Sequence, residues 1–296
     1  MRIVTRPDFD GIVCAALLLE VEPITQPIKW AQPSDMQKGR IDISNEDIIA
    51  NLPYSEHCAL WFDHHVTNKL AKPFKGAFRI APSAARVIHD HYANRFEKDF
   101  QDLVKNTDDI DAANLTQDQV RHPENYPFIL LSMTIGGQDE DEEAYWNHLV
   151  QLLRTDSIEN IVADPVVAQR CRETISRNKE YEVYLKRYTH LNSHVAITDF
   201  RSLSPPPDGN RFLAYSLFPD AIVSVRIRHA DLEKRQVTVS VGHSIFNRRC
   251  VVNVGMMLSK FGGGGHAGAG ACTFAQEKSN DVIPRIIDLL NGLNFH

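Results

Sequence analysis

The chain has 296 residues, of which 43% are hydrophobic, so it is long enough to bury two hydrophobic cores. Its net charge of −6 argues against a protein that coats long nucleic acids, although a local basic pocket can still hold a small anion. The five cysteines lie far apart without a C-x-x-C pair, which argues against a disulfide framework or a structural zinc site.

The first half of the chain alternates short apolar runs with helical patterns. The elements that we predict here are strands at 2–5, 28–31, 48–50 and 59–62 and helices at 12–21 and 83–92. A strand, a tight turn and a helix at the start are typical of a parallel α/β sheet. The near-continuous apolar character of the strands suits a sheet that is covered on both faces.

The second half begins with a helical pattern from 142 to 188. The elements predicted beyond it are strands at 195–198, 221–228, 236–241 and 271–274 and helices at 252–261 and 280–290. The sequence therefore predicts an α/β protein with three parts. These are an N-terminal parallel-sheet domain at 1–155, a helical connector at 156–192 and a smaller α/β domain at 193–296.

Two aspartates follow the first strand. Asp8 and Asp10 are two residues apart, so in extended backbone both carboxylates point the same way and can share a cation. Gly11 permits close backbone approach, and the helix that follows favours a bound anion at its N-terminus. The alternative is a purely structural role, because Asp is a good helix N-cap.

The tripeptide Asp63-His64-His65 ends the apolar run 58–62. A carboxylate and two imidazoles at a strand end offer metal ligands and a phosphate contact together, and open α/β sheets assemble sites from several strand ends. An ordinary exposed polar loop is the alternative. A third acidic group follows 100–104 and, taken alone, fits a solvated helix cap better than a ligand set. Its members are Asp108, Asp109 and Asp111.

These motifs resemble the DHH phosphoesterases that carry a C-terminal DHH-associated domain, a group with exopolyphosphatase-like and oligoribonuclease-like members. The resemblance covers nearly the whole chain. It rests on the segments 8–11, 63–65, 107–111, 253–254 and 261–266. It implies a metal-dependent phosphohydrolase that cleaves phosphoanhydride or phosphodiester bonds in a cleft between its two domains. The implied substrates are small: polyphosphate, a nucleotide or a short single-stranded oligonucleotide.

The resemblance also implies a role for each motif residue. The implied metal ligands, for one or two Mn²⁺ or Mg²⁺ ions, are Asp8, Asp10, Asp63, His64 and Asp108. The implied catalytic residues are Asp63, His64 and His65, with Asp63 either a ligand or the partner that orients His64, and with His65 directed at the substrate phosphate. Two ions would lower the pKa of a bridging water.

The glycine run near the C-terminus is the implied substrate-binding segment. Backbone amides of Gly263, Gly264 and Gly265, with His266, would contact the anionic substrate. The alternative is a flexible hinge. The Arg-Ser pair that is common in the family is matched here by His243 and Ser244, with Arg248 nearby, and His243 would be a pH-sensitive substitute.

Two positions depart from the family pattern. Arg6 stands close to where a histidine usually precedes the first aspartate pair, and Asn51 stands where a bridging aspartate is expected. Because a neutral amide bridges metals poorly, we expect a single tight ion, recruitment of Asp109 or Asp111, or an inert protein. A catalytically weakened nucleotide- or phosphate-binding sensor is therefore the alternative function. Arg6 is also a candidate anion contact.

The remaining expectations concern the cell. The chain opens without a charged leader, and no apolar stretch approaches membrane-spanning length. We therefore expect a cytoplasmic protein with no membrane association. The sequence leaves the exact substrate and the oligomeric state open, with a homodimer as one candidate.

Overall fold

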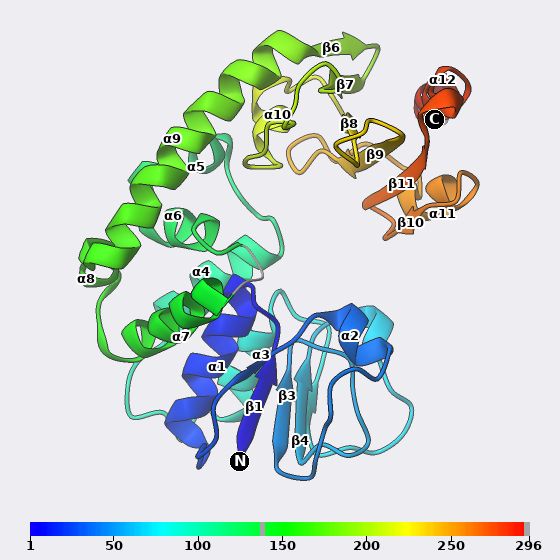
Figure 1. Cartoon of the computed structure of the whole chain (residues 1–296). Helices are drawn as coiled ribbons and strands as arrows, with labels where there is room; N and C mark the ends of the chain where they lie inside the picture. The colour runs from blue at the N-terminus through cyan, green and yellow to red at the C-terminus, as the bar shows by residue number, and fades with distance from the viewer. Residues whose placement is uncertain (137–139, 293–296) are drawn as a thin grey trace. The chain divides into compact units, whose positions relative to one another are not determined.

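The structure, a computed structural model, describes residues 1–136 and 140–292 and separates into two compact units (Figure 1). The first unit comprises 1–115 and 123–174, and the second comprises 116–122 and 175–296. The division falls inside helix α9 (Pro165–Tyr188), which lies within the expected connector. The last four residues of the expected 193–296 domain lie outside the described residues.

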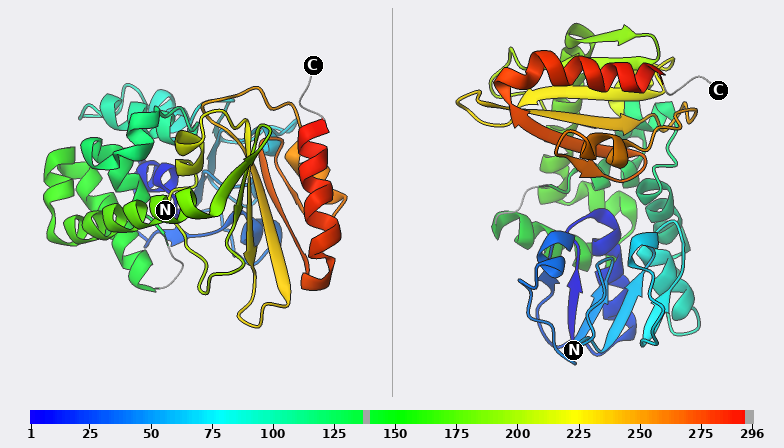
Figure 2. Two further views of the ribbon diagram at one scale, coloured as in Figure 1. Left: turned by 90° about the horizontal axis from the view of Figure 1, so that it is seen from above. Right: turned by 90° about the vertical axis from the view of Figure 1, so that its right-hand side faces the viewer.

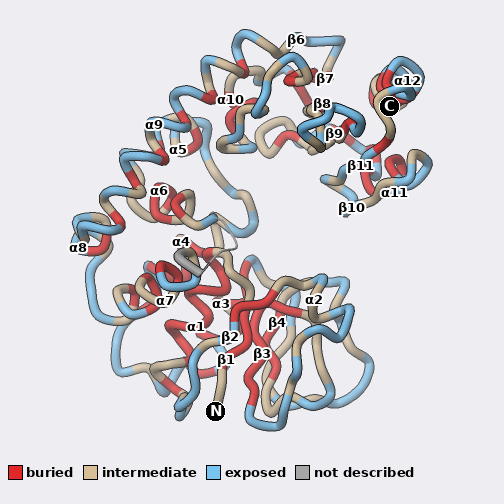
Figure 3. Tube along the Cα trace, in the orientation of Figure 1, coloured by how far each residue is buried: buried red, intermediate tan, exposed pale blue. Residues whose placement is uncertain are grey.

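The first unit is built on a parallel sheet of five strands in the order β2-β1-β3-β4-β5. The strands are β1 (Arg2–Thr5), β2 (Lys29–Trp30), β3 (Asp47–Ala50), β4 (Leu60–Asp63) and β5 (Gly76–Phe78). Buried residues dominate β1, β3 and β4 (Figure 3), as the apolar runs predict. Because neighbouring strands are parallel, the segments that follow β1, β3 and β4 leave the same edge of the sheet.

Helices that include α1 and α3 cover one face of this sheet, and loops with the short helix α2 cover the other, where Met36 packs on the cluster that contains Trp61. The helices of the unit are α1 (Phe9–Val21), α2 (Pro33–Gln37), α3 (Ala84–His91), α4 (Gln101–Asp111), α6 (Pro127–Met133), α7 (Glu140–Thr155), α8 (Ile158–Ala163) and the start of α9. Helix α1 packs against α3, α4 and α7. Phe62 on β4 contacts Tyr92 beside α3, whereas its neighbour Trp61 packs on Phe74 and Phe78 from the opposite face.

The second unit contains a mixed sheet of six strands in the order β10-β11-β9-β8-β7-β6. The strands are β6 (Thr189–Asn192), β7 (Val195–Asp199), β8 (Val223–His229), β9 (Gln236–His243), β10 (Gly264–Gly265) and β11 (Ala269–Ala275). The helices are α5 (Gln117–Arg121), α10 (Leu213–Leu217), α11 (Val254–Ser259), α12 (Ser279–Gly292) and the end of α9. Alternating residues of β8 and β9 pack in one core with Ile286 of α12, which runs along the sheet (Figure 2, left).

The predicted α/β class, with a parallel sheet first and a smaller second sheet domain, is confirmed. The parallel strands of the first unit are also visible in Figure 2, right. The mixed stretch 100–104, which precedes the third acidic group, begins helix α4. In the described part of the chain, no helix is both long enough and apolar enough to cross a membrane.

Candidate metal centre

The turn between β1 and α1 holds Asp8 at the start of the helix. Its Oδ1 accepts a hydrogen bond from the backbone amide of Gly11 at 2.9 Å, so Asp8 does cap α1 as the structural alternative predicts. A Cβ on Gly11 would lie 1.9 Å from the carbonyl oxygen of Arg6. The tight turn therefore requires glycine at this position.

Asp10 lies in the first turn of α1, and its side chain is fully buried. Its two oxygens accept hydrogen bonds from the backbone amides of Ala84 and Ala85 at 2.9 and 2.8 Å, so the N-terminus of α3 fixes the carboxylate. Burial, followed by the charges of Asp111 and Asp8, raises the pKa of Asp10 well above its ordinary value. A cation beside Asp10 would relieve both of these effects.

His64 follows β4 and directs one ring nitrogen at Asp10. Its Nδ1 lies 3.0 Å from the carbonyl oxygen of Ala81, which can only accept, so Nδ1 carries the proton and Nε2 carries the lone pair. Nε2 is 3.8 Å from Oδ2 of Asp10 and 3.5 Å from Oδ2 of Asp111. The side chain is 9% exposed, and Nε2 has no hydrogen-bond partner among the described residues.

Asp10, His64 and Asp111 thus form a group whose ligand atoms all lie within 4.8 Å of one another. Nitrogen and oxygen ligands that share one divalent ion at about 2.1 Å lie about 3–3.5 Å apart, close to the separations found here. A buried imidazole lone pair without a partner is an atom that such an ion would satisfy. The residues therefore fit a divalent cation.

The other two residues of the acidic group have different partners. Asp108 accepts hydrogen bonds from Oγ of Ser83 at 2.7 Å and from Nε of Arg86 at 2.8 Å, while Asp109 accepts one from Nδ2 of Asn114 at 2.9 Å. The structure places Asp111 at His64, whereas Asp108, the expected ligand, is engaged by Ser83 and Arg86. Helical spacing from the buried residues of α4 at 104 and 107 could have singled out position 111, which continues the same face.

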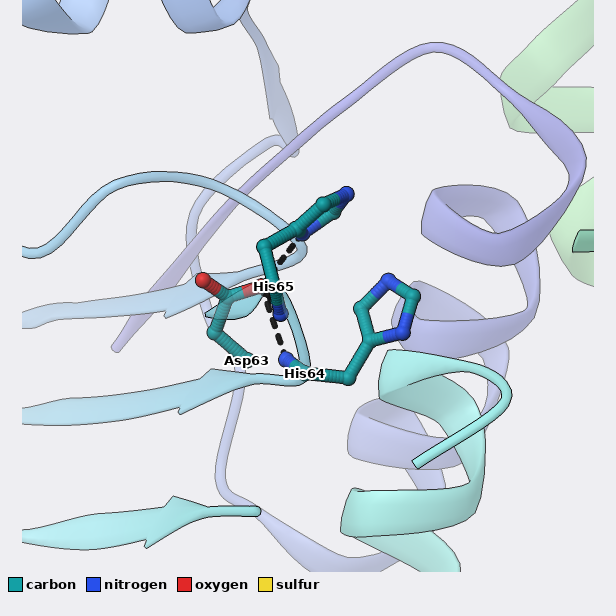
Figure 4. A group of neighbouring side chains, drawn as sticks. All are labelled: Asp63, His64 and His65. Atoms are coloured by element: carbon teal, nitrogen blue, oxygen red, sulfur yellow. Dashed lines mark hydrogen bonds and ion pairs between the residues drawn. The ribbon is translucent and has the colours of Figure 1, made fainter. Parts of the chain in front are cut away.

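Asp63 and His65 form a second pair at the end of β4 (Figure 4). Oδ1 of Asp63 accepts hydrogen bonds from Nδ1 of His65 at 2.8 Å and from the amide of His64 at 2.9 Å, and Oδ2 accepts one from Asn68 at 2.7 Å. Asp63, His64 and His65 also lie close enough together to hold an ion. Because Oδ1 of Asp63 accepts the hydrogen bond from Nδ1 of His65, Asp63 orients that ring.

His65 differs from His64 in its exposure. Its side chain is 36% exposed, and the hydrogen bond to Asp63 raises its pKa. The protonated form therefore persists to higher pH than for a free histidine. An exposed ring that gains its proton more readily than a free histidine, beside the candidate metal ligands, is suited to an anionic phosphate.

Arg6 and Asn51, the two departures from the family pattern, both contact Asp8. Nε of Arg6 forms an ion pair with Oδ2 of Asp8 at 3.0 Å, and Nδ2 of Asn51 donates to Oδ1 at 3.0 Å. Asn51 follows β3 with a φ of 56°, a conformation that asparagine tolerates better than most residues. Its own Oδ1 is buried and lacks a hydrogen-bond partner in the described residues. Burial raises the pKa of Asp8, and the charge of Arg6 opposes that shift.

In the second unit, the glycine run is part of the sheet rather than a linker. Gly264 and Gly265 form β10 and pair with Ala271 and Gly270 of β11. A Cβ on Gly263 would lie 2.3 Å from the carbonyl oxygen of Ala271, whereas a Cβ on Gly264 would meet nothing within 4 Å. Packing therefore requires glycine at position 263. At position 264 the space beside the backbone is open, so a ligand can reach it.

The remaining candidate substrate-binding residues surround the end of β9. The ring of His243 is held by its Nε2 at 2.9 Å from the carbonyl oxygen of Val252, and Ser244 is buried with its Oγ accepting the amide of Asn247 at 3.0 Å. Arg248 donates to the carbonyl oxygen of Ile245 at 3.0 Å, and both Arg248 and His266 are exposed. Exposure leaves Arg248 and His266 as the better anion contacts, and Ser244 shapes a turn.

No family model matches the sequence, and no curated protein matches it. Among solved structures, the pGpG-specific phosphodiesterase PggH of Vibrio cholerae is 31% identical, over 99% of this chain and 99% of that chain, with a TM-score of 0.87. The chain belongs to the DHH phosphoesterases. It is a metal-dependent phosphohydrolase, as the sequence predicts.

Two more distant structures share the fold of this DHH phosphoesterase. The exonuclease RecJ bound to manganese is 14% identical over 98% of this chain and 89% of its own, with a TM-score of 0.52. RecJ from Thermus thermophilus in complex with Mn²⁺ is 13% identical over 98% of this chain and 52% of its own, with a TM-score of 0.56. At these identities the two likenesses concern the fold alone.

Proposed function

We propose that this DHH phosphoesterase hydrolyses the phosphodiester bond of a short linear dinucleotide, with pGpG as the first substrate to test. The observation that carries the proposal is the 31% identity, over 99% of both chains, with a pGpG-specific phosphodiesterase. The grouping of Asp10, His64 and Asp111 supports it, because phosphodiester hydrolysis by this route needs a bound cation.

We assign metal binding, orientation of the phosphate contact and substrate binding to separate groups of residues. Asp10, His64 and Asp111 would hold Mn²⁺ or Mg²⁺, which when bound acidifies a water and draws charge from the phosphate. Asp63 orients the ring of His65 through Nδ1, so that the imidazole, when protonated, can hold the substrate phosphate. In the second unit we assign the backbone of Gly264 and the side chains of Arg248 and His266 to substrate binding.

Exposed apolar side chains beside the centre favour a nucleotide over polyphosphate. Val66, which directly follows His65, is 63% exposed, and Ile80, which directly precedes the carbonyl that holds His64, is 71% exposed. A polyphosphate chain has no apolar surface to place against them, whereas the faces of nucleobases do.

The proposal is tested with purified protein and Mn²⁺ against pGpG, pApA, a longer RNA, polyphosphate and phosphoadenosine phosphate, with the products separated by chromatography. We expect pGpG to be cleaved fastest, to mononucleotides. His64→Ala should abolish the activity, whereas His57→Ala, in an exposed loop of the same unit, should retain it. Preferential cleavage of polyphosphate or of the longer RNA would refute the proposal.

The second candidate function is a nucleotide sensor without turnover. Arg6 and Asn51 favour it, because both contact an aspartate that is expected to bind metal. It predicts pGpG binding by calorimetry with no product after prolonged incubation with Mn²⁺. Measurable turnover that depends on His64 excludes it.

A further inference from the structure

Asp8 offers little room for a metal ion. Its Oδ1 already accepts two hydrogen bonds, from the amide of Gly11 at 2.9 Å and from Nδ2 of Asn51 at 3.0 Å. A carboxylate oxygen has about two lone-pair directions, so these donors occupy both. Its Oδ2 faces Nε of Arg6 at 3.0 Å. A cation at the remaining lone pair of Oδ2 would lie beside the guanidinium and would be repelled by its charge.

Asn51 reinforces this arrangement through its amide orientation. Because the carboxylate of Asp8 can only accept, the amide must present its NH₂ group to Asp8 and turn its oxygen away. The residue is 1% exposed, so solvent does not compete for the contact. An aspartate at this position would instead place a second carboxylate against Asp8, a pair that a cation or a shared proton would have to stabilise.

Arg6 supplies a positive charge next to the carboxylate of Asp8, where the family resemblance implies a metal ion. Its side chain is 40% exposed, and the ion pair with Asp8 is made through Nε. A guanidinium has five donor hydrogens in a planar fork, so contact through Nε engages only part of that set. The remaining donors can bind a phosphate in two-point fashion.

We propose that this protein has a single-ion centre, held by Asp10, His64 and Asp111, in which the Arg6 guanidinium paired with Asp8 supplies the second positive charge to the substrate phosphate. The proposal rests on the proposed metal-dependent hydrolysis and departs from the two ions that the family resemblance implies. Asp8 becomes a positioning residue for Arg6. Asn51 becomes the residue that fixes Asp8 in that role.

The decisive measurement is the number of ions bound, which needs no substrate. Isothermal titration of the full chain with Mn²⁺ should give one ion per chain. Arg6→Ala combined with Asn51→Asp removes the guanidinium and adds a carboxylate, so this variant should bind two. Arg40→Ala is the matched control, because Arg40 forms a surface ion pair with Asp35 at 3.2 Å in the same unit, and it should still bind one.

The outcomes separate this inference from the proposed function. Two ions of similar affinity in the wild type would overturn the single-ion centre and leave metal-dependent hydrolysis intact. No ion up to millimolar Mn²⁺ would overturn both. One ion that survives His64→Ala but is lost in Asp8→Asn would place the ion at Asp8 and refute the assignment of Arg6.

A kinetic comparison tests the second half of the proposal. Arg6→Ala should raise KM for the dinucleotide about tenfold or more, because it removes a charged phosphate contact, with Mn²⁺ still bound at one ion per chain. Arg6→Lys keeps the charge but loses the fork, so it should recover only part of the loss. An unchanged KM in Arg6→Ala would show that Arg6 does not contact the substrate.

Discussion

Nε and Nη2 of Arg86 lie 2.8 and 2.7 Å from the same oxygen of Asp108, which ties α3 to α4. One turn later on α4, Asp111 lies 3.5 Å from Nε2 of His64. The two aspartates therefore have separable roles: one joins two helices, and the other faces the candidate metal ligands.

Two matched amide variants test this separation. Asp111→Asn should weaken Mn²⁺ binding more than about tenfold, because a neutral amide replaces a charged ligand. Asp108→Asn should bind Mn²⁺ nearly as the wild type does but lose about 1–3 kcal/mol of unfolding free energy, since it weakens a largely buried ion pair. Calorimetric titration and urea unfolding measure the two effects. Loss of Mn²⁺ binding in Asp108→Asn alone would reverse the assignment.

Metal removal should destabilise the first unit. Burial and neighbouring carboxylates raise the pKa of Asp10, so its charge opposes folding until a cation binds. A ligand at about 100 times its Kd adds about 2.7 kcal/mol of stability, so Mn²⁺ should raise the melting temperature by several degrees and EDTA should reverse the shift. The shift should vanish in His64→Ala and persist in His57→Ala. A persistent shift in His64→Ala would mean that the ion binds elsewhere.

The Arg2–Asp47 pair predicts how stability depends on pH. Burial alone would raise the pKa of Asp47, but hydrogen bonds from Arg2 at 2.7 Å and from Ser44 at 2.7 Å hold it below its ordinary value. The unfolded chain then binds a proton more readily than the folded one. The stabilisation is therefore complete above the unfolded pKa, about 3.9, and is lost as the pH falls through the lower folded value.

Asp47→Asn should accordingly cost about 2–4 kcal/mol at pH 7, because it leaves the Arg2 guanidinium without its charged partner. The difference from the wild type should shrink below about pH 4. Urea unfolding in EDTA at several pH values measures it. Asp35→Asn, at an exposed pair with Arg40, should change stability by only about 0.5 kcal/mol. A difference that stays constant down to pH 3 would contradict the assignment.

Gly263, which precedes β10, and Gly264, the first residue of β10, should differ in how much stability an alanine substitution costs. Gly263→Ala places a Cβ 2.3 Å from the carbonyl oxygen of Ala271 and should destabilise the second unit by about 2 kcal/mol or more. Gly264→Ala meets nothing within 4 Å, so its melting temperature should stay close to that of the wild type. If the backbone there contacts substrate, Gly264→Ala should raise KM, and an unchanged KM would remove Gly264 from the binding site.

The strands that are marked by short apolar runs in the sequence could be predicted. Strands β1, β3 and β4 are short, apolar and followed by polar motifs, so both their existence and the positions of Asp10 and His64 at one sheet edge follow from the sequence. The short strands β5, β6 and β10 were not predicted, because each depends on pairing with a distant segment rather than on its own composition.

Helical spacing along α4 favours position 111 over 108, but the sequence did not show that α4 lies against His64. Both aspartates lie on α4 one turn apart, and which of them reaches His64 depends on how Arg86 and Ser83 hold that helix. Adjacency suggested that Asp63 orients His64, whereas in the structure Asp63 holds Nδ1 of His65 and the carbonyl oxygen of Ala81 holds Nδ1 of His64. The contact of Asn51 with Asp8 joins segments 43 residues apart and needed the structure.

The backbone at Asn51 has an evolutionary consequence. Its φ of 56° is a conformation that aspartate also adopts readily, and the codons of the two residues differ by a single base. No rearrangement of β3 or of the turn after it would be needed to restore the carboxylate. The lineage of this protein could therefore pass between the two residues by one mutation, so relatives that differ at this position alone would be informative about how the centre diverged.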